Sequence, residues 1–123
     1  MINFKSFIES VWNSSGYRDN PIPMGKYNED NVQGPVHHIE KQLDKVSPTT
    51  RINVPEMVKN GTLKATQSYL HRHGGGDPVF DELEHPVLFK DEQGVHHIID
   101  GHHRLANALE RHAKSTEVHI FSK

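Results

Sequence analysis

The sequence contains no cysteine, which excludes a disulfide framework, a thiol nucleophile and a zinc site held by thiolates. It also lacks an apolar run of about 18 residues, the length that a membrane-spanning helix needs. The first residues, MINFKSFIESVW, carry Lys5 and Glu9 inside their apolar pattern, which is not the pattern of a signal peptide. These absences predict a cytoplasmic protein that has no membrane partner.

Apolar residues and positive charge are both scarce. Hydrophobic residues make up 33% of the 123, and the mean hydropathy is -0.72, so the chain has material for one domain with a modest core. The formal net charge of -2 gives no overall attraction to nucleic acid. Eleven histidines are present, and their protonation near pH 6 would make the chain positive. Weak nucleic-acid binding at acidic pH would therefore say little about function.

The most informative stretch is VHHIIDGHHRLANAL, residues 95–109. Its pattern predicts a buried strand at 95–99, a tight turn at Asp100 and Gly101, and a helix from His102 to about His112. The apolar stripe of that helix consists of Leu105, Ala106, Ala108 and Leu109. Backbone N–H groups and the positive end of the helix dipole meet at such a helix start, so the place suits an anion.

Three side chains at this helix start favour anion binding further. His102, His103 and Arg104 add donors and positive charge, and an arginine can hold a phosphate or carboxylate through two parallel hydrogen bonds. A simpler interpretation is that Asp100 only caps the helix while the histidines are solvated. The complete Asp-Gly-His-His-Arg string between a strand and a helix favours the functional interpretation.

The remaining pattern predicts a small α+β domain with a mixed sheet and packed helices. We expect strands at 49–54, 86–90, 95–99 and 116–121, helices at 62–71 and 102–112, and a helical turn at 54–58. Residues 1–47 are expected to form an N-terminal helical extension to the main unit at 48–123, with amphipathic helices at 2–13 and 36–46. Between these two helices, residues 16–36 predict an irregular segment, either a surface arm or a lid.

The string IIDGHHRLANAL resembles the signature of the ParB/sulfiredoxin-like superfamily, in which a strand, a glycine turn and an arginine-bearing helix start bind nucleotide phosphates. The flanks are similar too: residues 86–89 and 116–121 resemble the neighbouring strands, and LKATQSYL at 63–70 resembles the helix that lines the pocket. The resemblance covers about residues 48–121. It implies a nucleotide ligand, ATP or CTP with Mg²⁺, and nucleotide hydrolysis or phosphoryl transfer.

The resemblance also implies roles for particular residues. The nucleotide-binding set is Gly101, His102, His103, Arg104, Thr66 and Gln67. The catalytic candidates are Asp100, His102 and His103; Asp100 is among them because it is the carboxylate nearest the turn, where it could act as a base, bind Mg²⁺ or only cap the helix. His102 stands where sulfiredoxins carry their catalytic cysteine, so reduction of a sulfinic acid is excluded. No helix-turn-helix pattern follows the signature in the printed chain, so sequence-specific DNA reading of the chromosome-partition type is not expected.

Two other hypotheses remain open. The first is a metal-assisted DNA nuclease of the ParB-like type, with a transition metal held by His97, Asp100 and His102. The second is a regulatory or inhibitor module without catalysis, in which the N-terminal extension contacts a protein partner or DNA.

Overall fold

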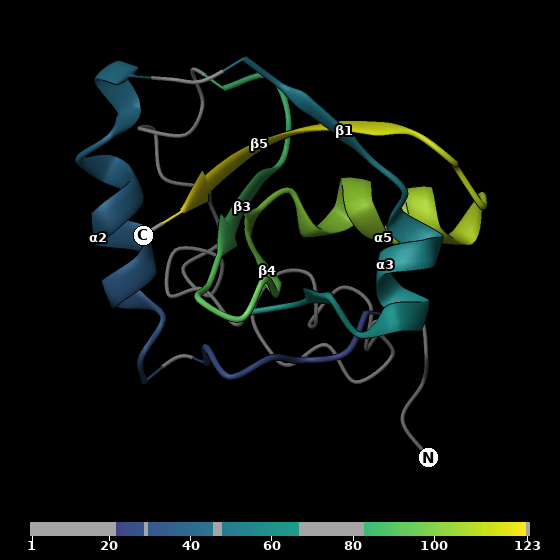
Figure 1. The fold of residues 1–123 in the computed structure, drawn as a ribbon, viewed down its shortest axis with the longest axis horizontal. Helices are drawn as coiled ribbons and strands as arrows, with labels where there is room; N and C mark the ends of the chain where they lie inside the picture. The colour runs from purple at the N-terminus through teal and green to yellow at the C-terminus, as the bar shows by residue number, and fades with distance from the viewer. Residues whose placement is uncertain (1–21, 29, 46–47, 67–82, 123) are drawn as a thin grey trace.

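The computed structural model describes residues 22–28, 30–45, 48–66 and 83–122, in which a five-stranded mixed sheet lies between helices (Figure 1). Its strands are β1 (Thr50–Ile52), β2 (Leu63–Lys64), β3 (Val87–Lys90), β4 (His96–Asp100) and β5 (Thr116–Ser122). Its helices are α2 (Gln33–Glu40), α3 (Val54–Asn60) and α5 (His102–Glu110), with a 3-10 turn, η1 (Leu43–Lys45), after α2. None of the helices in these ranges has the length and apolar character needed to cross a membrane.

The sheet has the strand order β1-β5-β3-β4-β2. The pairs β1/β5 and β3/β4 are antiparallel, whereas β3/β5 and β2/β4 are parallel. The predicted α+β class with a mixed sheet is therefore confirmed, and the four predicted strands are present with ends shifted by one or two residues. The N-terminal helix expected at 2–13 lies outside the described residues.

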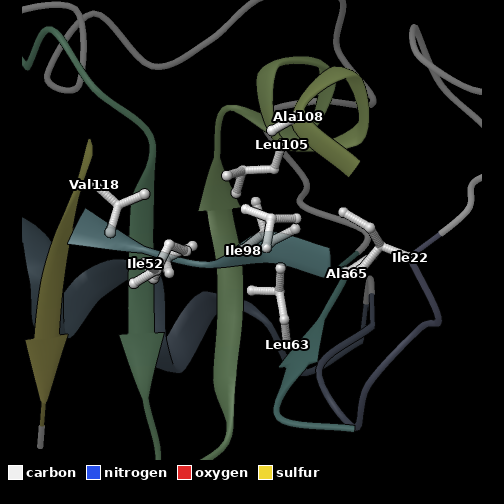
Figure 2. Close-up of a cluster of buried hydrophobic side chains, with 10 residues drawn as sticks. Ile22, Ile52, Leu63, Ala65, Ile98, Leu105, Ala108 and Val118 are labelled. Atoms are coloured by element: carbon white, nitrogen blue, oxygen red, sulfur yellow. The ribbon is translucent and has the colours of Figure 1, made fainter. Parts of the chain in front are cut away.

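Two apolar clusters form the core, one on each face of the sheet. Successive strand residues point to opposite faces, so Leu88 joins one cluster while its neighbours Val87 and Phe89 join the other. The first cluster contains Leu105 of α5, which points towards Ile98 on β4 (Figure 2). The second contains two residues of α2, Val36 and Ile39. Helices α3 and α5 therefore cover one face of the sheet, and α2 covers the other.

The helix predicted at 36–46 is shorter and begins earlier. Helix α2 ends at Glu40, where the N–H of Gln42 donates to the carbonyl of Ile39 at 2.8 Å and tightens the chain towards η1. The helical turn expected at 54–58 is instead the seven-residue α3, because both its ends are capped. The side chain of Asn53 accepts from the N–H of Glu56, and Gly61 ends the helix in the left-handed conformation.

The prediction of a helix at 62–71 is wrong for residues 62–66, the part of this range that the structure describes. Residues 63–64 form β2, which pairs in parallel with β4, and the N–H of His96 donates to the carbonyl of Thr62. Leu63 and Ala65 are both fully buried, a spacing of two that fits a strand. Pairing with β4 thus overrides the local helix preference of this stretch.

Of the predicted irregular segment at 16–36, residues 33–36 instead begin α2, and residues 22–28 lie along the edge of the sheet beside β2. The N–H of Ala65 donates to the carbonyl of Pro23, and the N–H of Gly25 donates back to the carbonyl of Ala65. Ile22 is buried in the first cluster. These bonds favour the surface-arm interpretation for residues 22–28 over that of a lid.

Gly101 joins β4 to α5 in a conformation that side chains rarely adopt. Its φ is 93°, and a Cβ added there would lie 2.7 Å from the Cβ of Pro86 and 2.9 Å from its Cα. Only glycine therefore fits this junction without strain.

We expect Gly101→Ala to lower the free energy of unfolding by about 1–3 kcal/mol through backbone strain, with the contact against Pro86 adding to the loss. Gly34→Ala is the matched control, because a Cβ at Gly34 has nothing within 4 Å and Gly34 lies in α2. That control should be unchanged or up to about 1 kcal/mol more stable. Urea unfolding measures both, and equal stabilities of the two variants would contradict this account of the junction.

Candidate functional site

The candidate site lies where β4 passes through Gly101 into α5. Gly101 occupies the N-cap position of the helix, so the simpler interpretation in which Asp100 caps it does not hold. The first bond between successive turns runs from the N–H of Leu105 to the carbonyl of Gly101 at 3.1 Å. The positive end of the α5 dipole therefore lies at the Gly101 junction.

A pocket of about 210 Å³ opens at this end of α5. It is lined by Leu83, His85, Pro86, Asp100, Gly101, His102, His103 and Arg104. The structure thus brings five of the predicted site residues, Asp100 through Arg104, around one hollow. We call this hollow the Gly101 pocket.

Arg104 and His103 are the exposed basic residues of the first turn of α5. The Nη1 group of Arg104 donates to the backbone carbonyl of Glu84, which holds the guanidinium at the rim of the pocket. That bond uses one of the five N–H donors of an arginine. Partial desolvation lowers the pKa of His103, so its imidazole is mainly neutral at pH 7 when no anion is near.

His102 turns inward and has a different environment. It is only 1% exposed, and its Nε2 accepts a hydrogen bond from the N–H of Thr66 at 3.1 Å. Thr66 is fully buried, and its hydroxyl donates to the carbonyl of Ile98 on β4. These bonds tie the start of α5 to β4 and to the chain after β2. An accepting Nε2 carries no proton, so this bond requires a neutral imidazole.

Thr66 was predicted to lie on a helix and to face the nucleotide. It instead follows β2 in extended chain, is buried and does not line the Gly101 pocket. Its neighbour in that prediction, Gln67, lies outside the described residues. Of the resemblance-based binding set, the junction residues meet at the pocket, and Thr66 supports them through His102.

The alternative metal set of His97, Asp100 and His102 does not meet at one point. His97 lies three residues before Asp100 on β4, about 10 Å along a strand that rises about 3.3 Å per residue. The Nε2 of His97 lies 2.9 Å from the carboxylate of Asp91, while that of His102 binds Thr66. Within residues 22–28, 30–45, 48–66 and 83–122, no three His, Asp or Glu side chains are grouped as metal ligands.

The His97–Asp91 pair has a structural role at the hairpin between β3 and β4. Burial raises the pKa of Asp91, but hydrogen bonds from His97 and from the backbone N–H groups of Val95 and Gln93 outweigh it and lower the pKa to about 2. Burial also lowers the pKa of His97. At neutral pH a neutral His97 therefore donates to an ionised Asp91 and fixes the turn.

His85 is a pocket residue that the sequence analysis missed. No predicted site residue directly precedes the strand at 86–90, yet the register of the hairpin places His85 near the junction. Val87 pairs with Asp100, so the residues just before Val87 lie beside the Gly101 junction. The imidazole of His85 lines the pocket, and its Nε2 lies 3.5 Å from a carboxylate oxygen of Glu117.

Comparison of the chain with known proteins found no matching family model, curated protein or solved structure. The geometry of the Gly101 pocket and the chemistry of its residues are therefore the basis for assigning a function.

We expect His102→Leu to destabilise the protein by about 1–3 kcal/mol, because it leaves the buried N–H of Thr66 without its acceptor. His103→Leu, one position further, replaces an exposed side chain and should change stability by less than about 0.5 kcal/mol. Urea unfolding at pH 7 measures both variants. A loss in His103→Leu as large as that in His102→Leu would refute the inward role of His102.

Proposed function

We propose that this protein binds the phosphate group of a nucleotide in the Gly101 pocket and uses it for nucleotide hydrolysis or phosphoryl transfer. The observation that carries the proposal is the pocket at the amino end of α5, rimmed by Arg104 and His103. The helix dipole, a guanidinium and an imidazole act there on one anion, and each favours its negative charge. A nucleotide site at this turn is also what the ParB/sulfiredoxin-like resemblance implies.

The size of the pocket supports a phosphate more than a whole nucleotide. Its volume of about 210 Å³ is below the range of roughly 300–1,000 Å³ typical of complete small-molecule sites. The phosphate is therefore the part of the ligand that enters the pocket. The sugar and base extend outside it.

Asp100 supplies the carboxylate that phosphoryl chemistry requires. Asp100 lines the Gly101 pocket at the end of β4. In the proposed reaction it accepts the proton of the attacking hydroxyl or water, or it holds the Mg²⁺ that accompanies a nucleotide. His102 positions the turn through Thr66, so in this proposal it acts on the pocket indirectly.

Arg104→Ala should weaken nucleotide binding about tenfold to a hundredfold, because one charge-assisted contact contributes roughly 1.5–3 kcal/mol. The fold should persist, since Arg104 is exposed. Lys59→Ala, which removes an equal charge from an exposed position on α3, is the control and should bind as the unaltered protein does. Calorimetric titration with ATP and CTP, with and without Mg²⁺, measures the affinities. Unchanged affinity in folded Arg104→Ala would contradict the proposal, and binding without turnover would favour a regulatory module.

The pH dependence separates a phosphate site from a transition-metal site. Desolvation lowers the pKa of His103, and a bound anion would raise it, so anion binding should strengthen as pH falls from 8 to 5.5. Sulfate is the suitable probe because its charge does not change in this range. The slope should be smaller in His103→Gln, and His85→Gln, which removes a partly exposed histidine of the same pocket, is the comparison variant. Affinity for a metal held by histidines would instead rise with pH, and a flat sulfate profile would remove His103 from the site.

A further inference from the structure

A second and larger pocket adjoins the Gly101 pocket. It has a volume of about 380 Å³ and shares His85, Pro86 and Arg104 with the first. Its other walls come from β1, from the outer side of α5 and from the start of β5. We call it the arginine pocket, because Arg51, Arg104 and Arg111 all line it.

The three arginines come from two elements of the fold. Two belong to α5 and its C-cap, and the third belongs to β1. Arg104 and Arg111 are seven residues apart, so they lie on the same side of α5, about 10 Å apart along its axis. Asn107 and Ala108 lie between them and complete the wall. Arg51 reaches the same pocket from β1.

Glu117 is the one acidic residue among the described residues that line the arginine pocket, and it contacts both Arg51 and His85. Its carboxylate oxygens lie 3.0 Å from Nη2 of Arg51 and 3.5 Å from Nε2 of His85, and the hydroxyl of Thr49 donates to it at 2.9 Å. The Nη1 group of Arg51 also donates to the hydroxyl of Ser115. The described lining therefore sets one carboxylate against three guanidinium groups, and the summed charge of these four groups is positive.

The lining of the arginine pocket indicates which part of a ligand it takes. Among the described residues, its lining contains no phenylalanine, tyrosine or tryptophan on which a base would stack, and it offers the guanidinium groups together with Asn107, Ser115 and Thr116. Guanidinium groups bind phosphates in a two-pronged manner, and amide and hydroxyl groups bind sugar oxygens. The pocket therefore suits a phosphate with its adjoining sugar.

We propose that the ligand carries two phosphate groups separated by a ribose, with the 5′-phosphate in the Gly101 pocket and the 3′-phosphate in the arginine pocket. This inference rests on the proposed function, because it needs the first phosphate to occupy the Gly101 pocket. Arg104, which lines both pockets, lies between the two phosphates. The shared chemistry belongs both to a nucleoside 3′,5′-bisphosphate and to the 5′-phosphorylated end of an oligonucleotide.

Calorimetric titration with three probes tests this inference: adenosine 5′-monophosphate, adenosine 3′,5′-bisphosphate and the 5′-phosphorylated dinucleotide pApA. The bisphosphate should bind about tenfold to a hundredfold tighter than the monophosphate, as expected for an added charge-assisted contact. The dinucleotide distinguishes a nucleoside bisphosphate from an oligonucleotide end as the ligand. Its affinity should equal that of the bisphosphate if the arginine pocket accepts a phosphodiester. Its affinity should equal that of the monophosphate if the arginine pocket requires a terminal phosphate.

The variants Arg111→Gln and Arg51→Gln should abolish the gain from the second phosphate and leave the affinity for the monophosphate within about twofold. Lys114→Gln is the matched control, because Lys114 is exposed near the end of α5 and does not line either pocket. It should retain the whole gain. Equal loss in Lys114→Gln would mean that overall charge, and not the arginine pocket, binds the second phosphate.

The outcomes separate this inference from the proposed function. If the monophosphate binds and the bisphosphate binds no tighter, the two-phosphate ligand is refuted and the Gly101 site stands. If the bisphosphate gain survives in both arginine variants, the second phosphate lies elsewhere and the inference fails. If no probe binds, the proposed function itself is refuted.

Discussion

The close contact between Gly101 and Pro86 is the constraint on which the candidate site depends. Gly101 must take a left-handed conformation against the proline for β4 to turn directly into α5. This turn sends His102 into the core and leaves His103 and Arg104 at the surface. The same two junction residues, Gly101 and Pro86, line the pocket, so the strain-sensitive turn and the proposed anion site are one structure.

A buried network of hydrogen bonds on the core side of the Gly101 turn stabilises its conformation. The N–H of Thr66 donates to His102, and the hydroxyl of Thr66 donates to the carbonyl of Ile98. Thr66, a single residue after β2, therefore connects β4 to the first residue of α5. A buried polar group that loses its hydrogen-bond partner lowers the stability of the fold. The network therefore favours this one arrangement of β4 and α5 over others. His102, which points inward, therefore stabilises the pocket, and His103 is exposed where it lines the same pocket.

The sequence allowed the mixed sheet and the junction to be predicted because their signals are local. The alternation of 116–121 and the helical spacing after Gly101 each lie within one element. The strand at 63–64 could not be predicted in this way, because it forms only when β4 pairs with it. Thr66 was misplaced for the same reason. The arginine pocket was missed because Arg51 and Arg111 meet only after β1 pairs with β5.

The central claim is that the amino end of α5 is the anion site of this protein. The most direct test is a titration with inorganic phosphate, followed by the backbone amide resonances in a ¹H–¹⁵N correlation spectrum. The account predicts saturable changes that are largest at residues 101–104, with smaller changes at His85. Largest changes elsewhere, for example at the separate pocket between Tyr27, His38 and Phe89, or no saturable change at all, would contradict it.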